Sequence, residues 1–502
     1  MSYSVSARLA TGTLIALASS FVLIAQEPPG PPAFVSFPIL THVAEAGLDH
    51  GHFVEGPGES AIPAPIFTPP APGTAGAASF TGVVAAINES DVSVAAGSYE
   101  GETGAVANAT HIVAGSNHIY PGACNAAAAP GTTGDCAPLA YSSMDGINFV
   151  KSSVSRVWNG TSFGIGFDPG LDVDKNGNFY FSYGVAPLSG SFPNAIVMMT
   201  SPDGINWQPL TPITFNKRRD FDDKYYLAID RSASQFANRI YVSWDRNSGN
   251  NQILYIASSS DGGNSWTAPI KVNDGTSKFE RVIGAYPAVD QATGVVYDSW
   301  HDYAKNIIFV DRSTSGGATW NKDVAAAATH AGFGADIGCV GGRSQGPAHA
   351  LKVGPSGALY LVYADPVQGR GFDVLLTKSS NGGATWSAPI RLNDDSGTAD
   401  QFPPTLSVAA GAGGDVVTVS FYDRRDDPAN CLAHVYATRS TNGGATWSAN
   451  AKLTTASSNF DGNPNGPGDY SSSSPFAALA AVFPFFSDHR TADYEIFTAA
   501  IK

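Results

Sequence analysis

Acidic and tyrosine side chains recur where the short apolar segments of this chain begin. "RRDFDDKYY", "KFERVIGAYP" and "PGDYSS" supply Asp222, Glu280, Asp469 and Tyr470 in chain order. Acid–base catalysis needs a carboxyl group with a raised pKa near a second carboxylate or a tyrosine. These four residues are therefore our candidate catalytic residues. Asp222 or Asp223 together with Asp469 would supply a pair of carboxylates, one to act as an acid and one as a base.

Cations at the same segment boundaries could hold a substrate. They are Arg246, Arg281, Arg343, Arg424 and Lys224. A planar guanidinium group binds a carboxylate through two parallel hydrogen bonds, which makes the arginines the stronger candidates. A structural alternative stays open, because aspartates that follow the second strand of each unit, such as Asp245 and Asp423, could cap turns or pair with neighbouring arginines.

One short pattern must position these segments. It reads "SSSDGGNSW" at 258–266 and occurs six times with variations, and its opening serines stand at 143, 201, 259, 313, 379 and 440. The intervals are 58, 58, 54, 66 and 61 residues. Such a period, built from short alternating strands, indicates one β-propeller blade per repeat. Each unit reads as strand, turn, strand, strand, pattern and a short fourth strand.

We therefore expect an all-β protein, a β-propeller of seven four-stranded blades, with six blades as the alternative if the weak first unit at 110–157 is misread. The last unit stops after its third strand, so closure of the ring needs a strand from elsewhere. The segment "ASFTGVVAAI" at 78–87 is the expected N-terminal donor. Because strands alternate in direction, the pattern lies on one face and the candidate residues converge on the axis at the other.

The pattern Ser-x-Asp-x-Gly-x-Thr-Trp resembles the Asp box, also called the bacterial neuraminidase repeat. Asp203 and Asp261, replaced by Asn381 and Asn442 in later copies, are expected to accept hydrogen bonds from turn N–H groups. Ser315 stands where Asp is expected. The glycines allow positive φ, and the tryptophans fill the gaps between neighbouring sheets. The resemblance covers about residues 90–502, and it implies a propeller without giving the pattern a catalytic role.

Resemblance to sialidases implies a glycoside hydrolase. That family holds the substrate carboxylate with three arginines and attacks with a tyrosine activated by a glutamate, alongside an aspartic acid/base. The axial candidates above could fill these roles, but the family's Arg-Ile-Pro signature is absent and seven blades exceed its six. Two functions stay open: a secreted, sialidase-like propeller that acts on glycans by exo-glycoside hydrolysis, or a propeller that binds carbohydrate or protein without catalysis.

The composition argues against several partners. Lys and Arg number 28 against 43 Asp and Glu, a net charge of −15, whereas nucleic acids and anionic membranes attract basic patches. "DVDKNGN" at 172–178 begins like a calcium loop but has Tyr183 in place of the glutamate at position twelve. We expect a turn there, with no metal and no cofactor. The expected partner is a glycan or glycoprotein, and we expect a monomer.

The N-terminus has the pattern of an export signal. An apolar run at 9–25 follows Arg8, so we assign residues 1–25 to a signal peptide, with an uncleaved membrane anchor as the alternative. Residues 26–77 are rich in Pro and Gly and read as a linker or arm, and 78–502 form the propeller. We expect Cys124 and Cys136 to form a disulfide, while Cys339 and Cys431 either pair or stay free. The protein is expected to be secreted or periplasmic, with no membrane span in the mature chain.

Overall fold

The computed structural model describes residues 87–91, 99–119, 124–125, 127–128, 134–188, 190–249, 251–276, 280–332, 335, 337–340, 345–346, 348–461, 466–490 and 494–502. The chain divides into two units, 1–36 and 37–502, and all described residues belong to the second. The expected signal peptide and the arm at 26–77 lie outside the described residues. No helix among the described residues is both long and apolar enough to cross a membrane.

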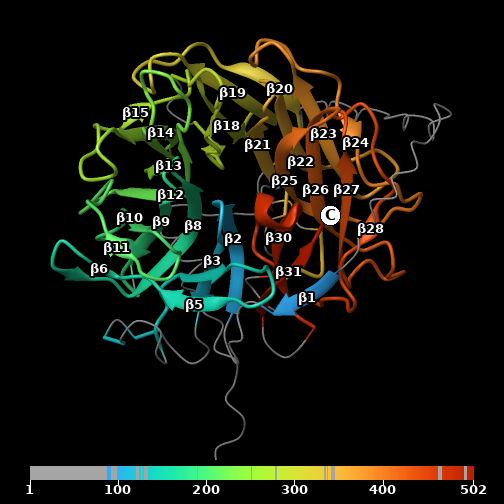
Figure 1. Cartoon of the computed structure of the whole chain (residues 1–502), viewed down its shortest axis with the longest axis horizontal. Helices are drawn as coiled ribbons and strands as arrows, with labels where there is room; N and C mark the ends of the chain where they lie inside the picture. The colour runs from blue at the N-terminus through green and yellow to red at the C-terminus, as the bar shows by residue number, and fades with distance from the viewer. Residues whose placement is uncertain are drawn as a thin grey trace, which may run out of the picture. The chain divides into compact units, whose positions relative to one another are not determined.

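Seven antiparallel sheets make up the described part of residues 37–502, as predicted for a seven-bladed β-propeller (Figure 1). Blade 1 contains β2 (Tyr99–Ala107), β3 (Ile112–Ile119), β4 (Leu139–Ser143) and β5 (Val150–Ser153). Blade 2 contains β8 (Ile165–Val173), β9 (Phe179–Ala186), β10 (Ala195–Ser201) and β11 (Gln208–Pro209). Blade 3 contains β12 (Asp220–Ile229), β13 (Ile240–Ser248), β14 (Asn251–Ser259) and β15 (Ile270–Lys271).

The inner strand of blade 4 is divided into β16 (Val282–Ile283) and β17 (Ala288–Val289), followed by β18 (Val296–Asp302), β19 (Ile307–Ser313) and β20 (Val324–Ala328). Blade 5 contains β21 (His349–Val353), β22 (Leu359–Pro366), β23 (Phe372–Ser379) and β24 (Ile390–Arg391). Blade 6 contains β25 (Gln401–Gly411), β26 (Gly414–Asp423), β27 (His434–Ser440) and β28 (Ala451–Lys452). A small hairpin, β6 (Val157–Trp158) and β7 (Thr161–Ser162), lies between blades 1 and 2 in sequence.

Blade 7 joins the two ends of the propeller domain. It contains β29 (Ser472–Phe476), β30 (Ala481–Asp488) and β31 (Glu495–Ala500), with the 3₁₀ helix η1 (Ala477–Leu479) after β29. Its outer strand is β1 (Ile87–Asp91), which pairs antiparallel with β31. Closure by an N-terminal strand is therefore confirmed, although the strand begins at the last residue of the predicted segment. This pairing covers the open edge of the last sheet with the start of the domain.

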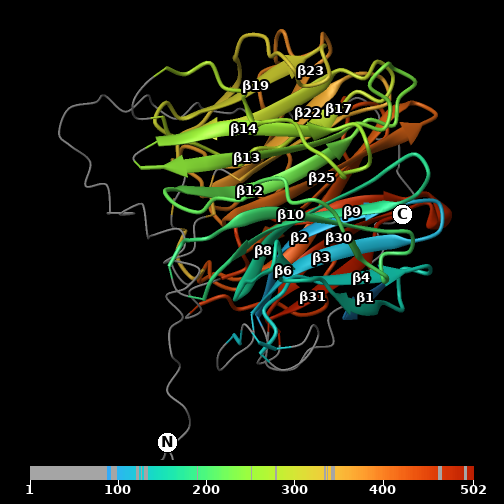
Figure 2. The same ribbon diagram turned by 90° about the vertical axis from the view of Figure 1, so that its left-hand side faces the viewer.

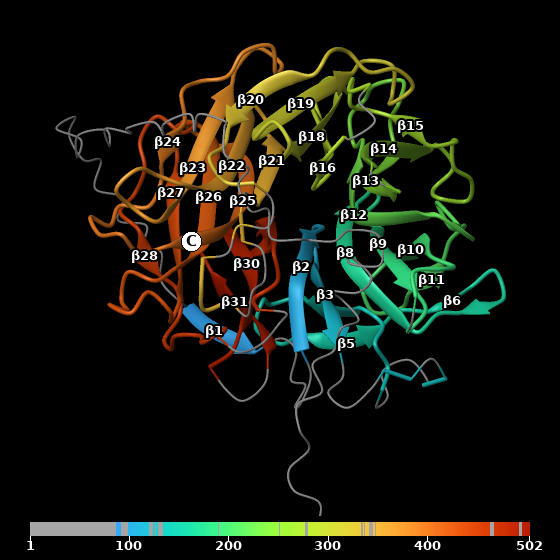
Figure 3. The same cartoon turned by 180° about the vertical axis from the view of Figure 1, so that it is seen from behind.

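Burial follows the position of each strand in its blade. The central strands β9, β18 and β30 are buried along their whole length, because each sheet packs between two neighbours (Figure 2). The outer strands β11, β15, β24 and β28 have only two residues each, which limits the exposed edge. The inner strands β2, β8, β12 and β25 surround the centre of the ring (Figure 3), and so they position the site.

The repeated pattern forms the turn between the third and fourth strands, as predicted. In blade 3 the Ser259 hydroxyl donates to Asp261 Oδ1 at 2.8 Å, and Ser265 N donates to the same oxygen at 2.9 Å. Hydrogen bonds from Ser265 are the main cause that lowers the pKa of Asp261 to about 2. Ser315 takes the place of the aspartate and accepts from Thr319 N at 2.9 Å. The pattern is thus a hydrogen-bonded turn, and its assignment to the Asp-box family stays a prediction.

Both pairs of cysteines are joined. Cys124 and Cys136 form the predicted disulfide, and Cys339 bonds Cys431. The second bond ties the loop before β21 to the loop after β26, across 92 residues of sequence. Disulfides persist in oxidising compartments, so this pairing fits a protein outside the cytoplasm.

We expect the Cys339–Cys431 bond to contribute more stability than the Cys124–Cys136 bond. Closing a loop of 92 residues restricts the unfolded chain more than closing one of 12. Cys431→Ser should therefore lower the free energy of unfolding by about 2–5 kcal/mol, and Cys136→Ser by less. Urea unfolding of both variants and the parent tests this, and an equal or reversed order would contradict it.

Two aspartates face each other inside blade 4. Asp298 and Asp311 are direct partners across β18 and β19, and they are 0% and 2% exposed. Burial raises the pKa of Asp298 well above its usual value and is the main cause that raises the pKa of Asp311 to about 7. Two adjacent carboxylates without a cation between them favour the protonated form.

The protein should accordingly lose stability as the pH rises from 5 to 8. A carboxyl group whose pKa is higher in the folded state stabilises the fold below its unfolded pKa and loses that contribution as the pH rises through the folded value. Asp311→Asn should reduce the loss by about 1–2 kcal/mol after allowance for screening. Urea unfolding at pH 5 and pH 8 measures it, with the exposed Asp461→Asn as the control. An unchanged pH dependence in Asp311→Asn would count against this assignment.

Candidate axial site

The inner strands of the first three blades share a bulge. Their registers shift between Gly101 and Gly104, between Phe167 and Gly170, and between Asp223 and Tyr226. The first residue of each bulge has positive φ: Glu102 (54°), Asp168 (58°) and Lys224 (54°). A charged residue in the left-handed region is strained, and such strain persists at sites that the surrounding structure holds in place. The repeated bulge thus identifies a part of the axis where charged side chains meet.

Lys224 is the centre of a buried ionic cluster. Its Nζ lies 2.9 Å from Asp469 Oδ1, 4.0 Å from Glu102 Oε1 and 4.0 Å from Asp168 Oδ2. All four side chains are more than nine-tenths buried. Burial opposes the charge of Lys224, but Asp168, Asp469 and Glu102 together raise its pKa well above the usual value. The cluster brings together inner-strand residues of blades 1, 2 and 3 and Asp469, three residues before β29 of blade 7.

Hydrogen bonds fix the carboxylates of this cluster. Asn117 Nδ2 donates to Glu102 Oε2 at 2.5 Å, and Asn117 Oδ1 accepts from Asp168 N at 2.7 Å. Asp469 N donates to Glu102 Oε1 at 3.3 Å. Gly468, with φ of +80°, packs so closely that a Cβ there would come within 2.5 Å of Glu102 Cγ. The glycine of the "PGDY" segment is thus required for the approach of Asp469.

Asp168 is paired with a tyrosine. The Tyr470 hydroxyl donates to Asp168 Oδ1 at 3.4 Å, and Lys224 Nζ lies 5.1 Å from the centre of the Tyr470 ring. Burial is the main cause that raises the pKa of Asp168 to about 6, opposed by Lys224 and assisted by Asp223 and Asp469. Burial also raises the pKa of Tyr470 well above its usual value. Asp168 therefore gains and loses a proton near neutral pH, while Tyr470 stays protonated.

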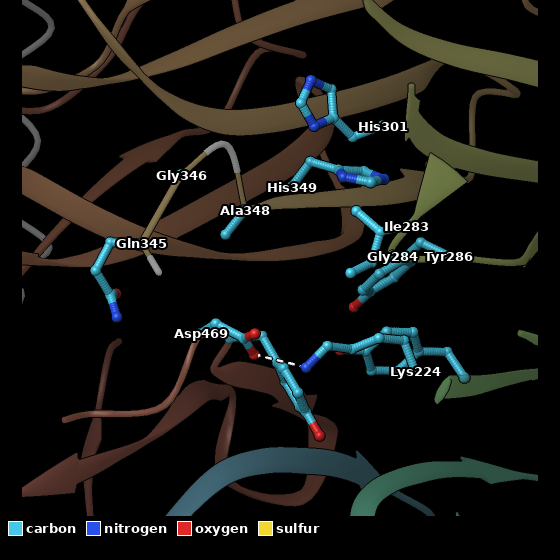
Figure 4. A pocket seen from close by; sticks show the side chains of 12 residues that line it. Lys224, Ile283, Gly284, Tyr286, His301, Gln345, Gly346, Ala348, His349 and Asp469 are labelled. Atoms are coloured by element: carbon cyan, nitrogen blue, oxygen red, sulfur yellow. Dashed lines mark hydrogen bonds and ion pairs between the residues drawn. The ribbon is translucent and has the colours of Figure 1, made fainter. Parts of the chain in front are cut away.

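A pocket opens beside the cluster (Figure 4). Its lining is Lys224, Tyr226, Ile283, Gly284, Tyr286, His301, Gln345, Gly346, Ala348, His349, Asp469 and Tyr470. Its empty space, including solvent at the mouth, is about 460 Å³. The Tyr226 ring lies 5.2 Å from the Tyr470 ring and 5.1 Å from the Tyr286 ring, measured between centroids. Aromatic walls with a few polar groups are typical of small-molecule sites.

Two histidines line the side of the pocket away from Lys224. His349 Nε2 lies 3.2 Å from Ser299 Oγ, and His301 Nε2 lies 3.0 Å from Thr329 Oγ1. Burial lowers the pKa of His349 to about 4 and that of His301 to about 3. Both imidazoles are therefore neutral at pH 7.

The structure brings three of the predicted site residues together: Lys224, Asp469 and Tyr470 line the same pocket. It places Asp222 and Glu280, the other two candidate catalytic residues, in ion pairs outside the pocket lining. Asp222 accepts two hydrogen bonds from Arg246, at 2.6 and 3.0 Å. Glu280 is paired with Lys271 at 3.0 Å and accepts from Asn273 Nδ2 at 2.6 Å. The catalytic and binding roles assigned to all these residues stay predictions.

The predicted arginines that the structure describes, Arg246, Arg281 and Arg424, do not line the pocket. Arg424 is fully buried, is paired with Asp400 at 3.3 Å and donates to the carbonyl oxygens of Ile337 and Gly338. Arg281 Nη1 donates to Glu280 O at 3.2 Å, and Arg343 lies outside the described residues. Sequence reasoning missed Glu102 and Asp168. The signal that could have found them is a charged residue two positions before a glycine, as in Glu102-Thr103-Gly104 and Asp168-Pro169-Gly170.

Taken together, these features define a seven-bladed β-propeller with a charged, aromatic pocket on its axis. No protein-family model matches the sequence, and no curated protein matches it. Among solved structures, an ulvan lyase of polysaccharide lyase family PL25 is 11% identical with a TM-score of 0.49, over 82% of this chain and 96% of that one. The Hadza microbial sialidase Hz136 is 15% identical with a TM-score of 0.43, over 72% and 73% of the two chains. An α-L-arabinofuranosidase from Fusarium graminearum is 14% identical with a TM-score of 0.44, over 66% and 92%. Likeness at this level assigns no activity to this chain.

Proposed function

We propose that this protein is an exported glycoside hydrolase that binds the terminal sugar of a glycan in the axial pocket. The observation that carries the proposal is the pairing of Tyr470 with Asp168, whose pKa is raised to about 6, beside a second carboxylate, Asp469. Titratable groups with displaced pKa values in a pocket are typical of acid–base catalysis. The tyrosine rings would pack against the apolar face of the sugar.

The two carboxylates have different surroundings and would take different roles. Asp469 lines the pocket and is ion-paired with Lys224, so it would act as the ionised nucleophile or base. Asp168 would be the acid: in its protonated form it would donate to the Tyr470 hydroxyl, the reverse of the bond that the ionised form accepts, and Tyr470 would pass its own proton to the leaving oxygen. Lys224 Nζ lies 2.9 Å from Asp469 Oδ1 and 4.0 Å from Asp168 Oδ2, so these two oxygens are at most 6.9 Å apart. This separation would allow both carboxyl groups to act on one glycosidic bond.

A second function is favoured by the completeness of the cluster. Glu102, Asp168 and Asp469 all have partners within the protein, and Lys224 joins blades 1, 2, 3 and 7. Such a network could serve the fold alone and leave the aromatic pocket to bind a glycan without cleaving it. Export of the chain by an N-terminal signal peptide is part of either proposal.

Hydrolysis of fluorogenic glycosides tests the choice between the two. The purified chain, starting near residue 26, is incubated with neutral α- and β-glycosides and with a sialoside. Turnover of a neutral glycoside would support hydrolysis in the axial pocket. Absence of turnover on every substrate, with sugar binding retained in calorimetry, would replace hydrolysis by the binding function.

A further inference from the structure

The hydrogen-bonding state of His349 follows from its neighbours. The Ser299 hydroxyl donates to the carbonyl oxygen of Tyr286 at 3.4 Å, so its oxygen is left to accept from His349 Nε2 at 3.2 Å. A neutral imidazole that carries its proton on Nε2 has a lone pair on Nδ1. Nε2 makes the contact with Ser299, and Nδ1 lies on the edge of the ring nearest to Gly284, which lines the pocket. His349 thus presents a hydrogen-bond acceptor to the pocket.

Space beside this acceptor is kept open by Gly284. Its φ of +76° favours glycine, and a Cβ there would lie 3.4 Å from His349 Cε1 and 3.9 Å from Nδ1. Gly284 also lines the pocket, on the edge of the imidazole that carries Nδ1 (Figure 4). A ligand atom rather than a side chain can therefore occupy this position.

The opposite end of the pocket is also rich in acceptors. Asp469 is a carboxylate, and Lys224 is the one Lys or Arg among the described lining residues. The Lys224 ammonium is already shared among Asp469, Glu102 and Asp168. Lys352 lies outside the lining, with its Nζ 5.4 Å from the centre of the Tyr286 ring. Among the described lining residues, an anionic ligand would meet carboxylates whose one cation is already shared.

We infer that the axial pocket selects an uncharged sugar over its acidic counterpart, and that His349 is a specificity residue that accepts a hydrogen bond from a sugar hydroxyl. The inference rests on the proposed function only in placing a glycan in this pocket. A hydroxyl group can donate to His349 Nδ1 and to Asp469, whereas a carboxylate has no proton to donate at neutral pH. The lowered pKa of His349 supports this assignment, because an imidazolium would attract a carboxylate.

Calorimetric titration at pH 7 with two matched pairs of sugars tests the inference. Glucose is compared with glucuronate and galactose with galacturonate, since the members of each pair differ only in a hydroxymethyl group or a carboxylate at C6. We expect the neutral member of at least one pair to bind tenfold or more tightly than its acidic partner. Tighter binding of the uronates would overturn the inference and leave the glycan site in place.

Two outcomes separate this inference from the proposed hydrolysis. A protein that binds neutral sugars but turns over no glycoside would refute the hydrolysis and support the selectivity. A protein that turns over a neutral glycoside but binds none of the four sugars, or binds the uronates as tightly, would refute the selectivity and leave the hydrolysis in place.

Variants at His349 test its role. His349→Phe keeps the ring shape without the acceptor and should weaken binding of the neutral sugar at least tenfold, whereas His349→Gln should recover part of that loss. His111→Phe, at a partly exposed histidine at the start of β3, is the matched control. Equal affinities of His349→Phe and the parent would overturn the role of His349. Asp469→Asn should narrow the preference for the neutral member of a pair, because it removes a carboxylate and frees part of Lys224.

Discussion

Replacing Lys224 by methionine should destabilise the protein by about 3–5 kcal/mol at pH 8, because three buried carboxylates would lose their common cation. Methionine keeps much of the length of the side chain, so the loss would come from charge rather than from a cavity. Urea unfolding followed by tryptophan fluorescence measures it. We expect this to be the largest stability effect of any single lysine in the described part of the chain.

The pH dependence separates this electrostatic effect from a packing effect. Without the ammonium, the three buried carboxylates would lose their cation, and the folded-state pKa of Asp168, which Lys224 lowers, should rise further. Their contribution is then retained at low pH and lost as the pH increases, so the variant should approach the parent near pH 4 and diverge from it by pH 8. A deficit of the same size at both pH values would indicate packing instead.

Two further variants sharpen the test. The double variant Lys224→Met/Glu102→Gln should recover part of the lost stability, since one of the unpaired carboxylates becomes neutral. Lys305→Met serves as the matched control, because Lys305 is 57% exposed in its pair with Asp302 and should lose less than about 1 kcal/mol. Equal losses in Lys224→Met and Lys305→Met would refute the central role of Lys224.

The fold could be predicted because its turns are specified locally. Ser259 and Asp261 satisfy the N–H groups of a turn within seven residues of chain, and a similar turn recurs in the first six units. The spacing of these turns then gave the number of blades, and the short last unit indicated closure by an N-terminal strand, which β1 provides. Each of these steps depends on residues close together in sequence.

The site was predictable only where a charged segment of the sequence could be recognised as the entry into an inner strand. Lys224 and Asp469 were found for that reason, but Glu102 and Asp168 come from inner strands whose meeting depends on ring closure. The bulge after Asp223 also changes which side chains face the axis. Asp222 is directly opposite Arg246 in the sheet and pairs with it there, whereas Lys224 points to the cluster. Sequence spacing alone does not reveal this interruption of the strand alternation.

Removal of the acid should abolish most of the proposed hydrolysis. In Asp168→Asn no acid can give a proton to Tyr470, and in Tyr470→Phe the hydroxyl group that would carry the proton is absent. Each variant should therefore lower kcat/KM by about 10²–10⁴. For the parent, the rate should fall as the pH rises through about 6, because Asp168 must be protonated to act as the acid. Asp168→Asn should lose this dependence along with the activity.

The rim of blade 6 offers matched controls for this experiment. There the Tyr436 hydroxyl donates to Asp426 Oδ2 at 2.7 Å, a tyrosine–carboxylate pair outside the pocket lining. Tyr436→Phe and Asp426→Asn should leave kcat/KM within about threefold of the parent, since this pair lies outside the pocket lining and touches no substrate. If Asp168→Asn and Tyr470→Phe instead behave like these controls while retaining sugar binding, the acid relay is refuted. The axial pocket would then be a binding site, and the bulged inner strands would serve to hold Lys224 among the carboxylates that join the blades.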